Sequence, residues 1–102
     1  MTLSVVITPE ARLDMAAAID YYNEVARIGE LFRLEVDRTI GIIQLWPEGC
    51  EVLEQPYRRA VMHHFGYLVV YRILPDRIRV IAVIAAARDP QALAARLASD
   101  PN

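Results

Sequence analysis

The chain has 102 residues, of which 55% are hydrophobic and 24% charged, and its formal net charge at pH 7 is −2. This length suits one domain with a single core, and the hydrophobic content excludes a disordered tail. No apolar stretch approaches the roughly 20 residues of a membrane span, and the N-terminus lacks the basic segment of a signal peptide. We therefore expect one domain over residues 1–102 with no direct membrane contact.

Charge is distributed unevenly along the chain. Residues 1–56 hold ten carboxylates and four arginines, a net charge of −6, whereas residues 57–102 hold three carboxylates and seven arginines, a net charge of +4. Arginine keeps its charge and forms paired hydrogen bonds with carboxylates or phosphates. The asymmetry predicts a dipolar molecule that draws an acidic partner towards its C-terminal half, although the absence of lysine also fits a GC-rich genome.

Cysteine and histidine usage argues against a metal or cofactor site. Cys50 is the single cysteine, so it has no partner for an internal disulfide, and this fits a reducing cytoplasm. His63 and His64 would point to opposite faces of a strand and rarely share a metal ion. An acid–base role for one of them would need a partner across the sheet, and we favour a half-exposed strand histidine instead.

The N-terminal half predicts a strand followed by two helices. Residues 3–7 form an apolar, β-rich run, after which Thr8 and Pro9 mark a helix start. Gly29 separates two helices, which must pack as an antiparallel hairpin. Apolar residues at steps of three and four form one stripe on each helix; they are Met15, Ile19, Tyr22 and Ala26, then Phe32, Val36, Ile40 and Ile43. We assign Asp14, Asp20 and Glu24 to the solvated side of the first helix.

From residue 51 onward the pattern changes to strands, expected over residues 57–63, 65–74 and 77–85. Alternation in the second strand divides its side chains between two faces, with Phe65, Tyr67, Val69 and Tyr71 on one and Leu68, Val70 and Arg72 on the other. An aromatic stripe of this kind indicates core packing, although stacking on a nucleotide is the alternative.

The last predicted strand is apolar on both faces. Val80, Ala82 and Ile84 alternate with Ile81, Val83 and Ala85, a pattern typical of a central strand covered on both sides. A short tail helix beginning near Asp89 and Pro90 leaves too little chain to cover the second face. We therefore expect this face to bind a partner or to cause aggregation of the isolated chain.

A series of residues along the chain carries a family resemblance. They are Ala11, Asp14-Met15, Ile19, Tyr22, Phe32, Ile40, Ile43, Pro47, Tyr57-Arg58-Arg59, Phe65-Gly66-Tyr67, Val70-Tyr71-Arg72, Ile78-Arg79-Val80, Arg88-Asp89-Pro90, Leu93 and Arg96-Leu97. In this order and spacing they resemble the RelE/ParE superfamily of bacterial toxins, most closely its ParE-like branch. The resemblance implies an α+β fold: an N-terminal strand, an antiparallel helix hairpin, a three-stranded antiparallel meander and a short C-terminal helix.

The resemblance also implies a function and partners. Members are toxins of type II toxin-antitoxin systems, act in the cytoplasm and pair with a cognate antitoxin encoded beside them. ParE-like toxins inhibit DNA gyrase, whereas RelE-like toxins cut mRNA on the ribosome, so nucleic acid is reached only through the antitoxin complex or the ribosome. A third alternative is a degenerate toxin retained as part of an autorepressor complex.

The chain departs from the ribonuclease branch where catalytic side chains are expected. Ala85, Ala86 and Ala87 stand at the end of the last strand, at positions where family members often carry a histidine and basic residues. Alanine can neither donate nor accept a proton. The chain also lacks lysine, and its last tyrosine is Tyr71. We therefore predict no catalytic residues and favour an inhibitor over an enzyme.

Four arginines are the predicted binding residues for the antitoxin or the target: Arg58, Arg59, Arg72 and Arg88. They lie on or beside the predicted sheet in the basic half of the chain. Adjacent strand residues face opposite ways, so only one of Arg58 and Arg59 can line a given surface. The alternative is a solvated strand face, or local pairing with Glu51 and Glu54.

Overall fold

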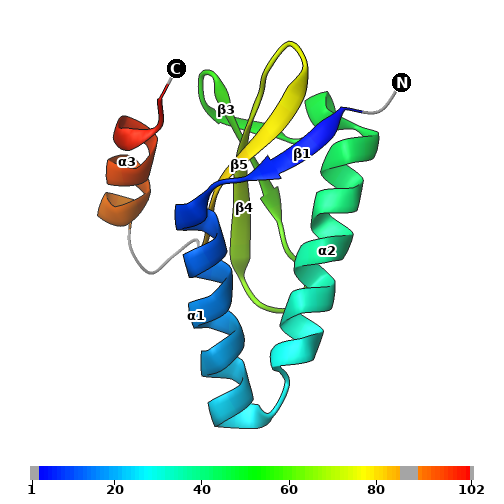
Figure 1. The fold of residues 1–102 in the computed structure, drawn as a ribbon, viewed down its shortest axis with the longest axis vertical. Helices are drawn as coiled ribbons and strands as arrows, with labels where there is room; N and C mark the ends of the chain where they lie inside the picture. Colours follow the sequence, from blue (N-terminus) through cyan, green and yellow to red (C-terminus); the bar gives the residue numbers. More distant parts are fainter. Residues whose placement is uncertain (1–2, 86–89, 102) are drawn as a thin grey trace.

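The computed structural model describes residues 3–85 and 90–101, which form a five-stranded sheet with helices on both faces (Figure 1). The strand order is β1-β5-β4-β3-β2, with β1 parallel to β5 and every other neighbouring pair antiparallel. In chain order the elements are β1 (Ser4–Ile7), α1 (Pro9–Ala26), α2 (Gly29–Leu45), a 3₁₀ turn (Pro47–Gly49), β2 (Glu51–Glu54), β3 (Tyr57–Val61), β4 (Tyr67–Ile73), β5 (Arg77–Ala85) and α3 (Pro90–Ser99). The predicted fold class is confirmed, and β2 adds a short edge strand to the meander.

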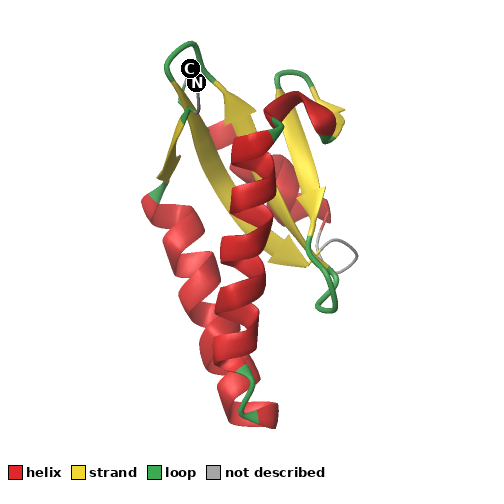
Figure 2. Ribbon diagram, turned by 90° about the vertical axis from the view of Figure 1, so that its right-hand side faces the viewer, coloured by secondary structure: helices red, strands yellow, loops and turns green. Residues whose placement is uncertain are grey.

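Local sequence determines the helix hairpin that Figure 2 shows side-on. The Thr8 hydroxyl accepts a hydrogen bond from the Ala11 backbone N–H at 3.1 Å and so caps α1. Arg27 ends α1 in the left-handed region with φ 55°. The Gly29 N–H then donates to Asn23 Oδ1 at 2.9 Å, and a Cβ at Gly29 would come within 2.5 Å of that oxygen. Only glycine, which has no Cβ, lets the backbone come this close to Asn23, so the predicted break at Gly29 is confirmed.

The face of the sheet towards the hairpin carries the larger core. Phe32, Val36 and Tyr71 are completely buried there. The Phe32 ring is stacked on Tyr22 at 5.5 Å between centroids and meets Tyr67 edge-on at 5.0 Å. Aromatic pairs of this geometry stabilise a core beyond their buried area. The prediction that the aromatic stripe of β4 belongs to the core is confirmed.

The opposite face of the sheet is covered by α3. Leu68, Val70 and Ile81 are buried there, and Leu93 and Leu97 of α3 pack against them. We expected the tail to be too short to cover this face, and that expectation was wrong. One helix of ten residues is enough, because Leu93 and Leu97 of α3 both pack against the buried residues of this face.

A β-bulge changes which side chains of β5 share a face. Val70 pairs with Ala82 and Tyr71 pairs with Val80, so Ile81 is an extra residue in β5. Val80 and Val83 therefore lie in the core of the hairpin face, whereas Ile81 and Ala82 both lie in the core under α3. The strict alternation predicted for residues 80–85 was wrong.

The turn between β3 and β4 is longer than predicted. His63 and His64 are exposed in this turn and do not belong to a strand. His64 and Gly66 have φ of 74° and 67°, which reverses the chain in a few residues.

Among the described helices, none is long and apolar enough to span a membrane.

Candidate partner-binding site

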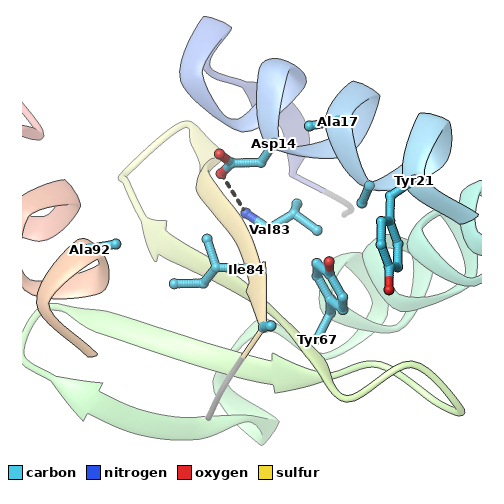
Figure 3. A pocket seen from close by; sticks show the side chains of 9 residues that line it. Asp14, Ala17, Tyr21, Tyr67, Val83, Ile84 and Ala92 are labelled. Atoms are coloured by element: carbon cyan, nitrogen blue, oxygen red, sulfur yellow. Dashed lines mark hydrogen bonds between the residues drawn. The ribbon is translucent and has the colours of Figure 1, made fainter. Parts of the chain in front are cut away.

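A groove lies where β5 ends, between α1 and α3 (Figure 3). Its volume is about 340 Å³, and alanines make up much of the described lining, which includes one carboxylate. The lining residues are Asp14, Ala17, Ala18, Tyr21, Tyr67, Val83, Ile84, Ala85 and Ala92. Sequence reasoning missed this groove because its residues come from four separate elements. The only part anticipated was the alanine-rich end of β5.

Asp14 and Arg96 connect the three elements around the groove. The Asp14 carboxylate accepts hydrogen bonds from the Val83 backbone N–H at 3.0 Å and from the Arg96 guanidinium at 2.7 and 3.0 Å (Figure 3 shows the first). Arg96 also donates to the Ile81 carbonyl at 2.9 Å. The pairing of β1 with β5 ends at Val80, so these two side chains bond to the strand edge that β1 leaves open.

The assignment of Asp14 to the solvated side of α1 was wrong, since its side chain is only 15% exposed. Asp20 and Glu24 are exposed as expected. The hydrogen bond that Arg96 donates to Asp14 raises the pKa of Arg96, which favours the charged guanidinium. α1, β5 and α3 are thereby joined by one charge-assisted contact.

A second polar cluster lies under the C-terminal end of α3. Tyr57, Arg72 and Arg79 are in register across β3, β4 and β5 and therefore share the α3 face. The Tyr57 hydroxyl and Arg79 Nη2 both donate to one Asp100 oxygen, at 2.8 and 3.0 Å. Arg79 also donates to the Pro101 carbonyl. The C-terminal segment thus neutralises one of two arginines that lie directly opposite each other.

The pKa of Tyr57 reflects this environment. Burial raises the pKa of Tyr57 most, and the hydrogen bond to Asp100 and the charge of Asp100 raise it further, while Arg72 acts in the opposite direction. The Nε atoms of Arg72 and Arg79 are buried and have no hydrogen-bond partner among the described residues. Arg72, the cross-strand neighbour of Tyr57, therefore retains a donor that no described residue uses.

The four predicted arginines have different surroundings. Arg58 faces the hairpin side and donates to the carbonyls of Glu48 and Cys50 at 3.1 and 2.7 Å, which holds the segment after α2 in place. Arg59 lies on the α3 face and forms an ion pair with Glu51, so the local pairing considered above is observed. Arg88 lies outside the described residues. The structure brings Arg59 and Arg72 to one face and Arg58 to the other, as strand alternation requires.

The segment after α2 is held by a second contact. The Tyr71 hydroxyl donates to the Pro47 carbonyl, and burial raises the pKa of Tyr71, with a hydrogen bond to Cys50 adding to the effect.

Within the described part of the chain, no group of three histidine, cysteine, aspartate or glutamate side chains could hold a metal ion.

Comparison with known proteins identifies the family. A family model described as "ParE toxin of type II toxin-antitoxin system, parDE" matches residues 5–90. The fold is similar to a chain of a solved structure, the chromosomal ParDE TA system from P. aeruginosa, with a TM-score of 0.70 and 14% identity, covering 81% of this chain and 95% of that one. A search of curated proteins found no match. Because the family match runs from β1 past the end of β5, the chain belongs to the ParE toxin family of type II toxin-antitoxin systems.

Proposed function

We propose that this toxin inhibits DNA gyrase by binding it, without chemistry of its own, and that a cognate antitoxin neutralises it in the cytoplasm. The observation that carries the proposal is the groove at the end of β5. Its described lining consists mainly of alanine and aliphatic side chains, and its one carboxylate, Asp14, already accepts three hydrogen bonds. Membership in the ParE toxin family supports the same reading.

The groove is poorly suited to cutting RNA, which is the RelE-like alternative. Cleavage would need one group to take a proton from a 2′-hydroxyl and others to stabilise the developing charge. Asp14 is bound to Arg96 and to the backbone of β5, and Ala85 offers no exchangeable proton. Arg59 and Arg72 could stabilise charge, but an arginine does not act as a base at neutral pH.

We place the antitoxin across the groove and the α3 face. Tyr21, which is 49% exposed, and the neighbouring alanines can accept apolar side chains of an antitoxin segment. Its carboxylates would then pair with Arg59 and Arg72 on the same side of the sheet, and with Arg88. Arg58 contributes to the fold through its bonds to backbone carbonyls, so we expect it to matter less for binding.

Expression without the antitoxin tests the gyrase assignment. We expect filamentation with DNA damage in cells and loss of supercoiling by gyrase when the purified toxin is added. Cuts in mRNA phased with the codons would establish the ribonuclease alternative instead. Unimpaired growth and unaffected supercoiling would support the degenerate toxin that serves an autorepressor complex.

Matched variants test the antitoxin surface separately from the target. Ala17→Arg places a long side chain in the groove, whereas Ala16→Arg adds the same charge to an exposed position of α1 outside it. We expect only Ala17→Arg to weaken antitoxin binding strongly. Equal binding by both variants would place the antitoxin elsewhere while leaving the gyrase assignment untouched.

The arginines are tested by binding kinetics at low and high salt. Arg59→Ala, Arg72→Ala and Arg88→Ala should weaken the complex, whereas Arg12→Ala and Arg27→Ala, on the hairpin, should not. Charge pairs at a rim act mainly through the association rate, so part of the effect should fade with salt. If the hairpin arginines matter as much, the antitoxin does not bind the α3 face.

A further inference from the structure

α2 carries a second apolar stripe that no part of the described chain covers. Leu31, Leu34, Ile42 and Leu45 are 54%, 48%, 47% and 85% exposed. At about 100° per residue they share a face roughly 80° wide, centred about 140° around the helix from the buried Phe32, Val36 and Ile43. Figures 1 and 2 show α2 along one side of the molecule with its outer side open. A helix that is apolar on two separate faces is expected to be covered on both.

The stripe is symmetric about Arg38. Leu31 and Leu45 lie seven residues before and after it, and Leu34 and Ile42 lie four residues before and after it. We infer that this face is the interface between two copies of the chain, with the two α2 helices antiparallel about a twofold axis near Arg38. Leu31 would then meet the partner's Leu45, and Leu34 would meet the partner's Ile42. Such an isologous contact needs a self-complementary surface, which the pattern supplies.

The two ends of the stripe are complementary in shape. A cavity of about 330 Å³ lies beside Leu31 and Leu34 and is also lined by Ile28, Glu35, His64 and Phe65. At the other end of α2, Trp46 is 72% exposed, yet its ring is held against Gly49, where a Cβ would come within 2.9 Å of a ring atom. The antiparallel arrangement brings the partner's Leu45 and Trp46 to this cavity. Large side chains that fill a pocket are the usual anchors of an interface.

Two further features fit a helix packed against a copy of itself. Gly41 lies within α2, where glycine weakens a helix, and among the described residues no packing neighbour comes within 4 Å of its Cβ position, so none of them requires a glycine there. A glycine there lets a second backbone approach closely. Glu35 Oε2 is buried without a hydrogen bond and lies 3.8 Å from Arg38 Nη1. In the dimer each Arg38 would lie near its own and the partner's Glu35, which offsets the repulsion between the two arginines.

The charges beside the stripe do not favour a partner other than a second copy of the chain. Beside the stripe, Arg33 is already paired with Glu30 and with Asp37, at 2.7 Å from the latter. This flank therefore presents neither a strongly acidic nor a strongly basic surface. The inference goes beyond the proposed function and does not depend on it, because the groove and the α3 face lie on other elements.

Cross-linking of the full chain tests both the dimer and its register. In a Cys50→Ser background, Arg38→Cys should cross-link to itself through a short bis-maleimide, because packed helix axes lie about 8–10 Å apart. Leu31→Cys alone should not, since its two copies would be about 21 Å apart along the helices at a rise of about 1.5 Å per residue. A mixture of Leu31→Cys and Leu45→Cys chains should cross-link. Cross-linking without this position dependence would overturn the register.

Sedimentation over a range of concentrations measures the association itself. Leu34→Glu and Leu45→Glu should each raise the dissociation constant at least tenfold, with helix content unchanged by circular dichroism. Leu13→Glu, on α1 and 70% exposed, is the matched control and should have no effect. A folded chain that stays monomeric at all concentrations, or a dimer indifferent to Leu34→Glu and Leu45→Glu, would disprove the inference.

Discussion

The two faces of the sheet are covered in different ways. Towards the hairpin, α2 contributes Phe32, Val36 and Ile43, all completely buried, and the contact is held by apolar area and aromatic packing. Towards α3, two half-buried leucines are supplemented by hydrogen bonds that Asp14 accepts from Arg96 and that Asp100 accepts from Tyr57 and Arg79. Packed apolar side chains keep most of their contacts when an element moves slightly, whereas a hydrogen bond depends on the positions of single atoms. One substitution can therefore loosen α3 while the hairpin side stays folded.

Truncation of a core ring should have the largest effect. Phe32→Ala removes a fully buried ring that contacts Tyr22, Phe65 and Tyr67, and we expect a loss of about 3–5 kcal/mol in the free energy of unfolding. Denaturant titration of the purified chain measures it. Leu13→Ala, an exposed leucine on α1, should change the stability by less than about 0.5 kcal/mol. Equal losses would mean that the aromatic cluster does not dominate the core.

Breaking the Asp14–Arg96 pair should have the next largest effect. Removal of one member of a fully buried pair costs about 3–5 kcal/mol, and this pair is 15% and 24% exposed, so we expect about 2 kcal/mol for Asp14→Ala. Hydrogen exchange should show that the amides of α3 lose protection while those of α2 keep theirs. Asp20→Ala is the control on the same helix. Uniform loss of protection would show that α3 does not unfold separately.

The Asp100 cluster is more buried than the Asp14–Arg96 pair but should contribute less, because Asp100 lies beyond the last residue of α3 and can move without unpacking Leu93 and Leu97. Asp100→Ala leaves Arg79 and Tyr57 without their shared acceptor, and we expect a loss of about 1–2 kcal/mol. Asp76→Ala provides a comparison, because Asp76 pairs with Arg77 and is 73% exposed. Thermal unfolding of both variants measures the difference. A smaller effect at Asp100 than at Asp76 would contradict the role given to the C-terminal segment.

High pH should produce the smallest and most gradual effect. Burial raises the pKa of Tyr57 and of Tyr71 above the ordinary value of about 10. As the pH rises, the unfolded chain therefore loses these protons before the folded chain does. Stability should be unaffected below about pH 9 and should fall as the pH rises through about 10. Tyr57→Phe should reduce this fall in denaturant titrations, and Tyr21→Phe, at an exposed position, is the control. An equal fall in stability in both variants would show that Tyr57 does not cause the pH dependence.

Elements defined by short-range signals were predicted well. Thr8 and Pro9 start α1 and Gly29 starts α2, because caps and glycine breaks act within a few residues. The bounds of β5 also agree with the prediction. The short edge strand β2 was not predicted, since four residues with little burial carry almost no periodic signal.

The candidate site was predicted less well, since it depends on distant residues. Strand alternation placed Arg72 with Leu68 and Val70 correctly, and it separated Arg58 from Arg59. It could not show that Arg58 would bind the carbonyls after α2. It also left Asp14 on the solvated side of α1, because its partner Arg96 is 82 residues away.

The sequence by itself determined the family, the order of the elements, the helix hairpin and the aromatic core beside it. These follow from local propensity and from periodic patterns that each segment carries alone. Only the tertiary structure decided the bulge at Ile81, the coverage of the second sheet face by α3 and the groove beside Asp14. Each of these requires two or more elements to meet, and a pattern read along one segment does not encode which distant segment it will contact.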